Sequence, residues 1–151
     1  MEKLNGKKKL RVAVFISGRG TNLKSLLNFT KNKNSPIKIV LVITSNRNAK
    51  GIFFAKQHKI KLIFVNYKNK NEAENKILIN LINYKVNFIC LAGFMKILSK
   101  KIINNYKNKI LNIHPSLLPK YKGLNTHKRV LKNKEKFTGC TVHLVNKKLD
   151  S

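Results

Sequence analysis

The apolar residues of this chain follow two alternating patterns. Continuous apolar runs that suit buried strands lie at residues 10–17, 37–44, 61–65, 86–91, 110–114 and 139–145. The segments between them carry helical spacing or helix-start signals, which predict helices over residues 21–29, 51–58, 71–84, 99–106 and 124–133. Strands that alternate with helices predict an α/β fold, an open, mostly parallel sheet with helices on both faces.

Turn and cap signals refine these boundaries. A Gly-Arg-Gly turn at residues 18–20 ends the first strand, and Thr21 or Asn22 is expected to cap the first helix. The sequence has no internal repeat or linker, so we interpret residues 1–151 as one domain with a basic leader over residues 1–9. The chain stops shortly after the last predicted strand, without a closing helix.

The charge of the chain is strongly positive. It has 33 Lys+Arg against 5 Asp+Glu, a formal net charge of +28, which invites a nucleic-acid interpretation. Only 4 of the positive residues are arginine, the better group for bidentate phosphate and base contacts. The lysines accompany 21 asparagines and many isoleucines, a composition that an AT-rich genome favours. We therefore expect no specific nucleic-acid partner, although anionic small substrates are attracted.

The cysteines argue against a metal site, and the apolar runs argue against a membrane-spanning protein. Cys90 and Cys140 lie in apolar runs and lack metal-ligand spacing, so buried, reduced thiols in a cytoplasmic protein are expected and no metal is predicted. No apolar run approaches the ~18 residues of a membrane span. The oligomeric state is left open.

Three segments are expected at the carboxyl ends of the strands, where open α/β sheets bind ligands. In the first, Ile16 to Leu23 (ISGRGTNL), the backbone amides of Gly20, Thr21 and Asn22 open a helix and offer a phosphate cradle. The alternative is a plain strand-to-helix turn. The third glycine of a dinucleotide fingerprint is absent, so NAD binding is not predicted.

The second segment is Leu91 to Ser99 (LAGFMKILS). Its apolar residues Phe94, Met95, Ile97 and Leu98 follow a strand end and a glycine turn, and they suit a slot for a flat ring. The alternative, favoured by the pattern alone, is core packing under the next helix.

The third segment, Leu111 to Gly123, carries the clearest chemistry. Asn112 and His114 alternate on a strand, so both side chains point to one face. An amide donor beside an imidazole suits a carbonyl oxygen that gains negative charge, whereas the alternative is a hydrogen-bonded strand-end pair. The lone aspartate, Asp150, would reach and orient His114 if the last two strands are neighbours; otherwise it is a solvated terminal acid.

Together, ISGRGTNL, LAGFMKILS, LNIHPSLLPKYKGLNTH and the late Leu-Asp pair resemble the phosphoribosylglycinamide formyltransferase family over essentially the whole chain after the leader. The resemblance implies a Rossmann-like formyltransferase fold, here lacking the family's closing C-terminal strands and helix. It also implies transfer of a formyl group from the co-substrate 10-formyltetrahydrofolate to the amine of glycinamide ribonucleotide (GAR).

The resemblance also implies roles for individual residues. Gly20, Thr21 and Asn22 would hold the acceptor's phosphate, and Pro115 would contact the substrate. The folate pocket would be lined by Met95, Lys96, Ile97, Leu98 and Asn112. Asn112 and His114 would bind the formyl oxygen, His114 would act as general acid, and Asp150 would pair with His114.

This sequence departs from the family in three places. Lys96 stands where relatives often have arginine, and Asn71, with Lys70 beside it, occupies the place of a folate-contacting arginine. The early chain end makes an inactive remnant of the same fold one alternative. A methionyl-tRNA formyltransferase is the second, although GRGTNL and GLNTH suit the small phosphorylated acceptor better. Formyltetrahydrofolate hydrolases share the fold but begin with a regulatory domain, and a nucleic-acid-binding module is the alternative from another class.

Overall fold

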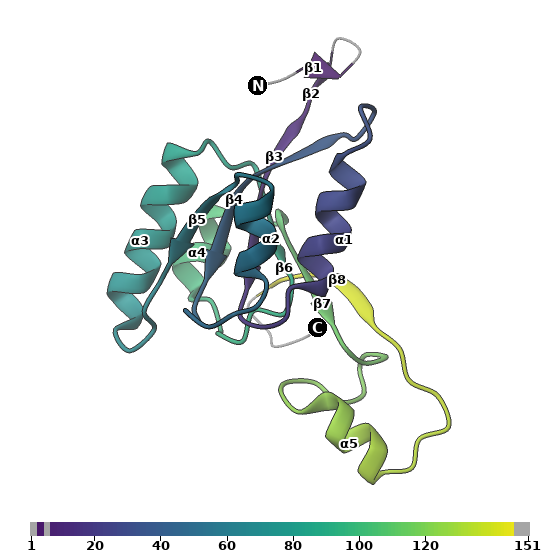
Figure 1. Ribbon diagram of the computed structural model, residues 1–151. Coiled ribbons are helices and arrows are strands. Elements are labelled where there is room, and N and C mark those ends of the chain that lie inside the picture. Colours follow the sequence, from purple (N-terminus) through teal and green to yellow (C-terminus); the bar gives the residue numbers. More distant parts are fainter. Residues whose placement is uncertain (1–2, 5–6, 147–151) are drawn as a thin grey trace.

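The computed structural model describes residues 3–4 and 7–146, with side chains from residue 8 onward. Its main feature is a six-stranded sheet in the order β5-β4-β3-β6-β7-β8 (Figure 1). The strands are β3 (Leu10–Ile16), β4 (Ile37–Thr44), β5 (Lys61–Phe64), β6 (Phe88–Leu91), β7 (Ile110–His114) and β8 (Thr141–Leu144). The pairs from β5 to β7 are parallel, and β8 runs antiparallel to β7. The predicted open, mostly parallel sheet is confirmed.

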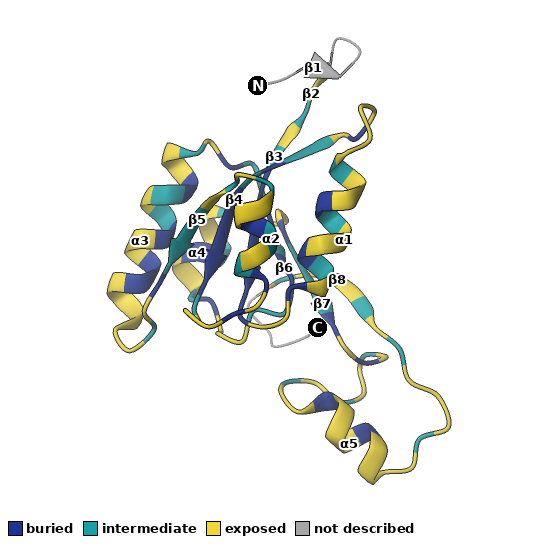
Figure 2. Ribbon diagram, viewed as in Figure 1, coloured by how far each residue is buried: buried dark blue, intermediate teal, exposed yellow. Residues whose placement is uncertain are grey.

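Four helices cover the two faces of this sheet. The helices are α1 (Thr21–Thr30), α2 (Ile52–Gln57), α3 (Lys70–Asn83) and α4 (Lys100–Asn105). Along β3 the buried side chains alternate, because successive residues of a strand point to opposite faces. Ala13 and Phe15 pack with α3 and α4, whereas Val12, Val14 and Ile16 pack with α1 and α2. The fully buried strands lie at the centre of the sheet (Figure 2).

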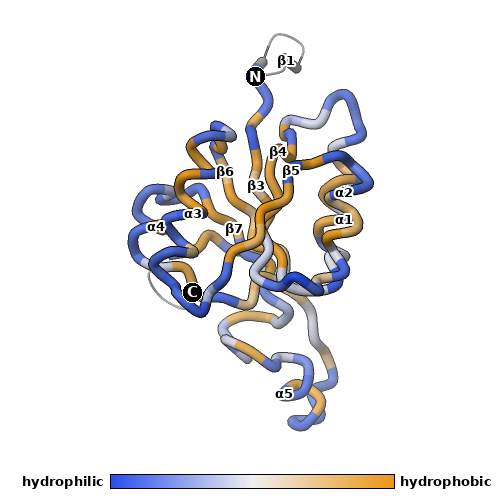
Figure 3. The backbone as a smooth tube through the Cα atoms, turned by 60° about the vertical axis from the view of Figure 1, so that its left-hand side comes forward, coloured by the Kyte–Doolittle hydropathy of each residue, from blue (hydrophilic) through white to orange (hydrophobic). Residues whose placement is uncertain are grey.

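The last helix, α5 (Thr126–Lys132), lies apart from these layers. It projects from the β7–β8 end of the sheet on two long connections, and most of its surface is exposed (Figures 1 and 2). Figure 3 shows the apolar strands gathered in the body. Residues 115–140, the arm that carries α5, mix hydrophobic and hydrophilic stretches in the same view. Within the predicted leader, β1 (Lys3–Leu4) and β2 (Lys7–Lys8) pair as a small antiparallel sheet.

The prediction of a Thr21 or Asn22 cap for the first helix is wrong. Gly20 is the N-cap, with φ 77°, and no side chain caps the helix. Glycine adopts this left-handed conformation without steric cost, so the turn itself sets the helix start.

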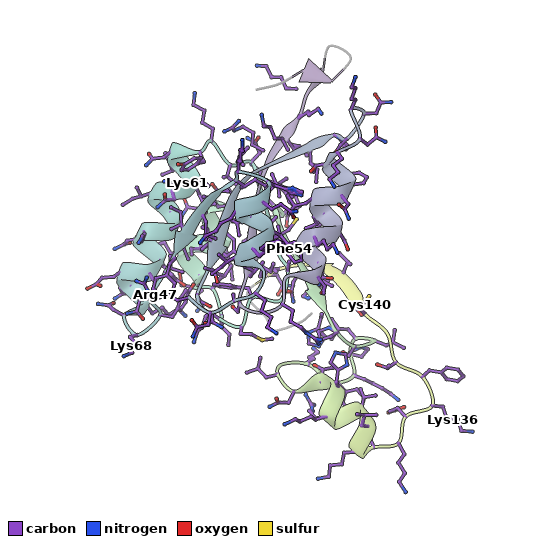
Figure 4. All side chains as sticks on the ribbon, in the orientation of Figure 1. Arg47, Phe54, Lys61, Lys68, Lys136 and Cys140 are labelled. Carbon is purple, nitrogen blue, oxygen red and sulfur yellow. The ribbon has the colours of Figure 1, made fainter. Side chains whose placement is uncertain are left out.

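The prediction that both cysteines are buried is wrong for Cys140. Cys90 on β6 is partly buried, but Cys140 is exposed. Cys140 lies at the end of the extended connection from α5, one residue before β8 begins, where no helix covers the chain (Figure 4). Both thiols are free. No helix in the described part of the chain is long and apolar enough to cross a membrane.

Candidate active site

The strand order reverses beside β3, and the connections from β3 and β6 leave toward opposite faces of the sheet. Ligands of open α/β sheets bind in the crevice at such a point. Ser17 ties the surrounding loops together: its Oγ accepts the Met95 N–H at 3.0 Å and lies 2.9 Å from Ser45 Oγ. Its carbonyl accepts the Asn46 amide at 3.1 Å. The loops after β3, β4 and β6 therefore form one connected rim.

The N-terminus of α1 opens on this rim. Thr21 and Asn22 are the first two helical residues, and their N–H groups have no partner within the helix. No acidic residue lies in the first turn, so the positive end of the helix dipole is uncompensated there. Gly20 lies close to the backbone of Gly51, since a Cβ at position 20 would lie 2.4 Å from Gly51 Cα. The helix start that was predicted to hold a phosphate is therefore fixed by a close contact between two glycines.

A pocket of about 500 Å³ lies between the loop after β6, the start of α4 and the β7–β8 pair. Among the residues predicted for a folate site, Lys96, Ile97, Leu98 and Asn112 line it. Met95 does not; its side chain is exposed, and its amide is the one bound to Ser17. The complete lining is Lys70, Leu91, Phe94, Lys96, Ile97, Leu98, Ser99, Lys100, Ile103, Asn112, His143, Val145 and Asn146.

The pocket combines an apolar wall with a positive rim. Lys70, Lys96 and Lys100 reach it from three different segments, and none of its described lining residues is acidic. The sequence pattern singles out Lys70 only as a neighbour of Asn71 and does not single out Lys100. Only the packing of α3 against α4 places these two helix starts beside the loop after β6.

The wall of the pocket is fixed from behind by aromatic and polar contacts. The ring of Phe94 meets Phe15 and Tyr67 edge-on, at centroid distances of 5.2 and 5.8 Å. The buried carboxylate of Glu74 accepts the Ser99 N–H at 2.8 Å and so caps α4 from α3. Burial, and secondarily the Glu74 carboxylate, raises the pKa of the Tyr67 phenol. These contacts make the wall a preformed part of the fold.

Asn112 and His114 lie on the same face of β7, as predicted. His114 is only 4% exposed, and its Nε2 lies 2.8 Å from the Tyr121 carbonyl. A carbonyl only accepts, so Nε2 carries the hydrogen and donates it. This bond also fixes the loop that begins with Pro115, an exposed residue. Ser116 Oγ donates to the Lys120 carbonyl at 2.7 Å in the same loop.

Asn112 has a partner that the sequence pattern does not reveal. Its Nδ2 lies 3.2 Å from His143 Nε2, across the antiparallel pair that joins β7 to β8. The antiparallel register places residues 112 and 143 directly opposite each other, and that register was the missing signal. The condition set for an Asp150–His114 contact is met, since β7 and β8 are neighbours, but Asp150 lies outside the described residues. No group of three or more potential metal ligands occurs among the residues described.

The chain is similar to known proteins over nearly its whole length. The formyl transferase family profile matches residues 10–151. The trifunctional purine biosynthetic protein adenosine-3 of Gallus gallus is 43% identical over 146 residues, which cover 95% of this chain and 15% of that protein. Phosphoribosylglycinamide formyltransferase of Haemophilus influenzae is 43% identical over 143 residues, covering 93% of this chain and 68% of that protein.

Solved structures give the same relationship. The crystal structure of phosphoribosylglycinamide formyltransferase from Anaplasma phagocytophilum superposes with a TM-score of 0.90 at 41% identity, and the match covers 95% of this chain and 68% of that one. This chain therefore spans about two thirds of the bacterial relative's length and a much smaller share of the trifunctional one.

Proposed function

The chain belongs to the formyl transferase family, and from this we propose that it transfers a formyl group from 10-formyltetrahydrofolate to the amine of GAR. One observation carries the proposal: Asn112 lines the 500 Å³ pocket while His114 follows it on the same face of β7. An amide donor and an imidazole at the edge of a pocket suit an acyl-transfer centre. We further propose that the protein acts in the cytoplasm.

The pocket beside Asn112 suits a folate. Its wall of Leu91, Phe94, Ile97 and Leu98 matches a flat ring system, and the three lysines at its rim match an anionic tail. Lysines recognise carboxylates as point charges rather than as bidentate forks, so the interaction at Lys96 is expected to depend strongly on salt. Met95 is assigned to the folate loop through its backbone bond to Ser17 rather than through its side chain.

The start of α1 suits the phosphate of the acceptor. Backbone N–H groups of Thr21 and Asn22, with the turn at Gly20, offer several donors at the positive end of a helix. The reacting centre lies beyond the carboxyl end of β7, and Pro115 opens the loop that leaves it. A substrate with an amine at one end and a phosphate at the other would link these two regions of the crevice.

The chemistry needs one proton to move from the attacking nitrogen to the leaving nitrogen. The GAR amine attacks the formyl carbon, the carbonyl becomes an oxyanion, and the bond to the folate nitrogen breaks as that nitrogen is protonated. Asn112 would donate an N–H to the oxyanion. Because His114 Nε2 is held by the Tyr121 carbonyl, Nδ1 is the atom through which His114 would exchange the proton. Asp150 is proposed to orient this imidazole.

The test is formyl transfer by the purified chain, supplied with GAR and 10-formyltetrahydrofolate. His114→Ala is expected to lower turnover by ~10²–10⁴, and Asn112→Ala by ~10²–10³. Ile113→Val, on the opposite face of β7, is the matched control and should retain turnover. Equal loss in all three variants, or no transfer by a folded chain that binds both substrates, would overturn the proposal.

The same assay separates the alternatives. Methionyl-tRNA replaces GAR in one arm, and the acceptor is omitted in another, so that transfer to RNA and hydrolysis of the donor are measured directly. Asp150→Asn should reduce turnover and leave GAR binding nearly intact; unchanged turnover would remove Asp150 from the mechanism.

A further inference from the structure

We propose that His143 is a positioning residue that keeps the amide of Asn112 turned as a hydrogen-bond donor toward the reacting oxygen. This inference rests on the proposed function, because the reacting oxygen is the one that function supplies. His143 itself touches no reacting atom in this scheme and acts through Asn112.

The second hydrogen bond of the His143 ring decides which atom donates and which accepts between Asn112 and His143. His143 Nδ1 lies 3.3 Å from the Leu144 carbonyl, which only accepts, so we assign the Nδ1–H tautomer to this ring. His143 Nε2 is then an acceptor, and the atom of Asn112 that faces it at 3.2 Å must be Nδ2 rather than Oδ1. One amide hydrogen binds the imidazole, and the other is the donor assigned to the formyl oxygen.

Loss of the acceptor at His143 removes the contact that holds Asn112 Nδ2 on this side. A half-turn about its last bond would aim Oδ1 at the developing oxyanion, which repels it instead of stabilising it. A donor at position 143 would favour the turned state outright. The fold supports the contact from both sides, because antiparallel pairing places the two residues opposite each other and both line the same pocket.

Three variants test the polarity. His143→Gln places an acceptor where Nε2 lies and should retain turnover within about threefold. His143→Leu, with neither donor nor acceptor, should lower kcat by ~10-fold, and His143→Lys, a donor only, by ~10²-fold, approaching the loss of an oxyanion-hole donor. KM for the folate should change little. Val142→Ala, on the other face of β8, is the matched control.

A second readout needs no substrate. In ¹⁵N-histidine-labelled protein, the imidazole nitrogen shifts of His143 should report the Nδ1–H tautomer near neutral pH, and the Asn112 side-chain amide should shift in His143→Leu. The Nε2–H tautomer, or equal turnover in His143→Lys and His143→Gln, would overturn the inference even if formyl transfer is observed. The expected tautomer in a chain without formyl transfer would instead refute the proposed function and leave the contact standing.

Discussion

Replacing Gly20 with alanine is expected to cost the fold ~2–5 kcal/mol, because two separate penalties add at this position. The first is conformational, since φ is 77° and a side chain in the left-handed region costs ~1–2 kcal/mol. The second is steric. A Cβ would lie 2.4 Å from Gly51 Cα, against ~3.5–4.0 Å for a normal carbon contact. The obstacle is backbone, so no rotamer relieves it, and such overpacking costs ~1–3 kcal/mol.

Two other glycines isolate these penalties. Gly93 has φ 79°, but no atom of the described residues lies within 4 Å of the place a Cβ would take, so Gly93→Ala should show the conformational cost alone. Gly18 has neither feature, and Gly18→Ala should change the free energy of unfolding by less than ~1 kcal/mol. The expected order of destabilisation is therefore Gly20, then Gly93, then Gly18.

Equilibrium urea unfolding measures the series. With a slope of ~2 kcal/mol per molar urea, Gly20→Ala should lower the midpoint by ~1–2.5 M. Since Gly20 also sets the start of α1, its substitution should weaken GAR binding more than the other two substitutions do. Equal midpoints for Gly20→Ala and Gly93→Ala would show that the approach to Gly51 carries no energy and would refute the steric part of the reasoning.

Three further predictions concern the thiols, the pocket wall and the arm. Cys140 should react rapidly with a disulfide reagent at pH 8, whereas Cys90, whose pKa burial raises to about 11, is only ~10⁻³ thiolate there and should react after unfolding; two fast thiols would contradict this. Glu74→Ala should lower the free energy of unfolding by ~1–3 kcal/mol by leaving the amide of Ser99, the N-cap of α4, without its acceptor, and Glu74→Gln should restore most of that loss. The hydrogen bond from the Tyr121 hydroxyl, with a neighbouring lysine, lowers the pKa of Glu135. The contact between Tyr121 and Glu135 therefore stabilises the arm fully above the ordinary glutamate pKa, and this stability is lost as the pH falls through the lowered pKa of the folded state. NMR titrations of the parent chain and of Glu135→Gln check this, because only the parent chain should show the transition.

The pattern of the chain predicted the central strands closely and the exposed helix faces less well. The strands at residues 37–44 and 110–114 were predicted to the residue, because Pro36 and Pro115 mark their ends in the sequence. Phe29 and Ile82, by contrast, are exposed although they fit the helical spacing. Short helices on a sheet bury only a narrow stripe, and periodicity does not reveal its width.

The candidate site likewise contains one feature that the sequence predicts and one that only the structure reveals. The shared face of Asn112 and His114 follows from strand alternation, which is a local property of the backbone. The contact between Asn112 and His143 depends on the register between β7 and β8. Thr141, which begins β8, lies 27 positions after His114, which ends β7. A register of this kind is set by packing and loop geometry, not by the residues of either strand alone.

The sequence by itself determined the α/β class, the segments at the strand ends and the residue types that carry the chemistry, because these depend on local period and local turns. The tertiary structure decided which loops share a rim through Ser17 and how closely Gly20 approaches Gly51. It also decided which lysines surround the pocket and which imidazole fixes the amide of Asn112. Each of these is a contact between segments distant in sequence, and its geometry exists only once the helices have packed on the sheet.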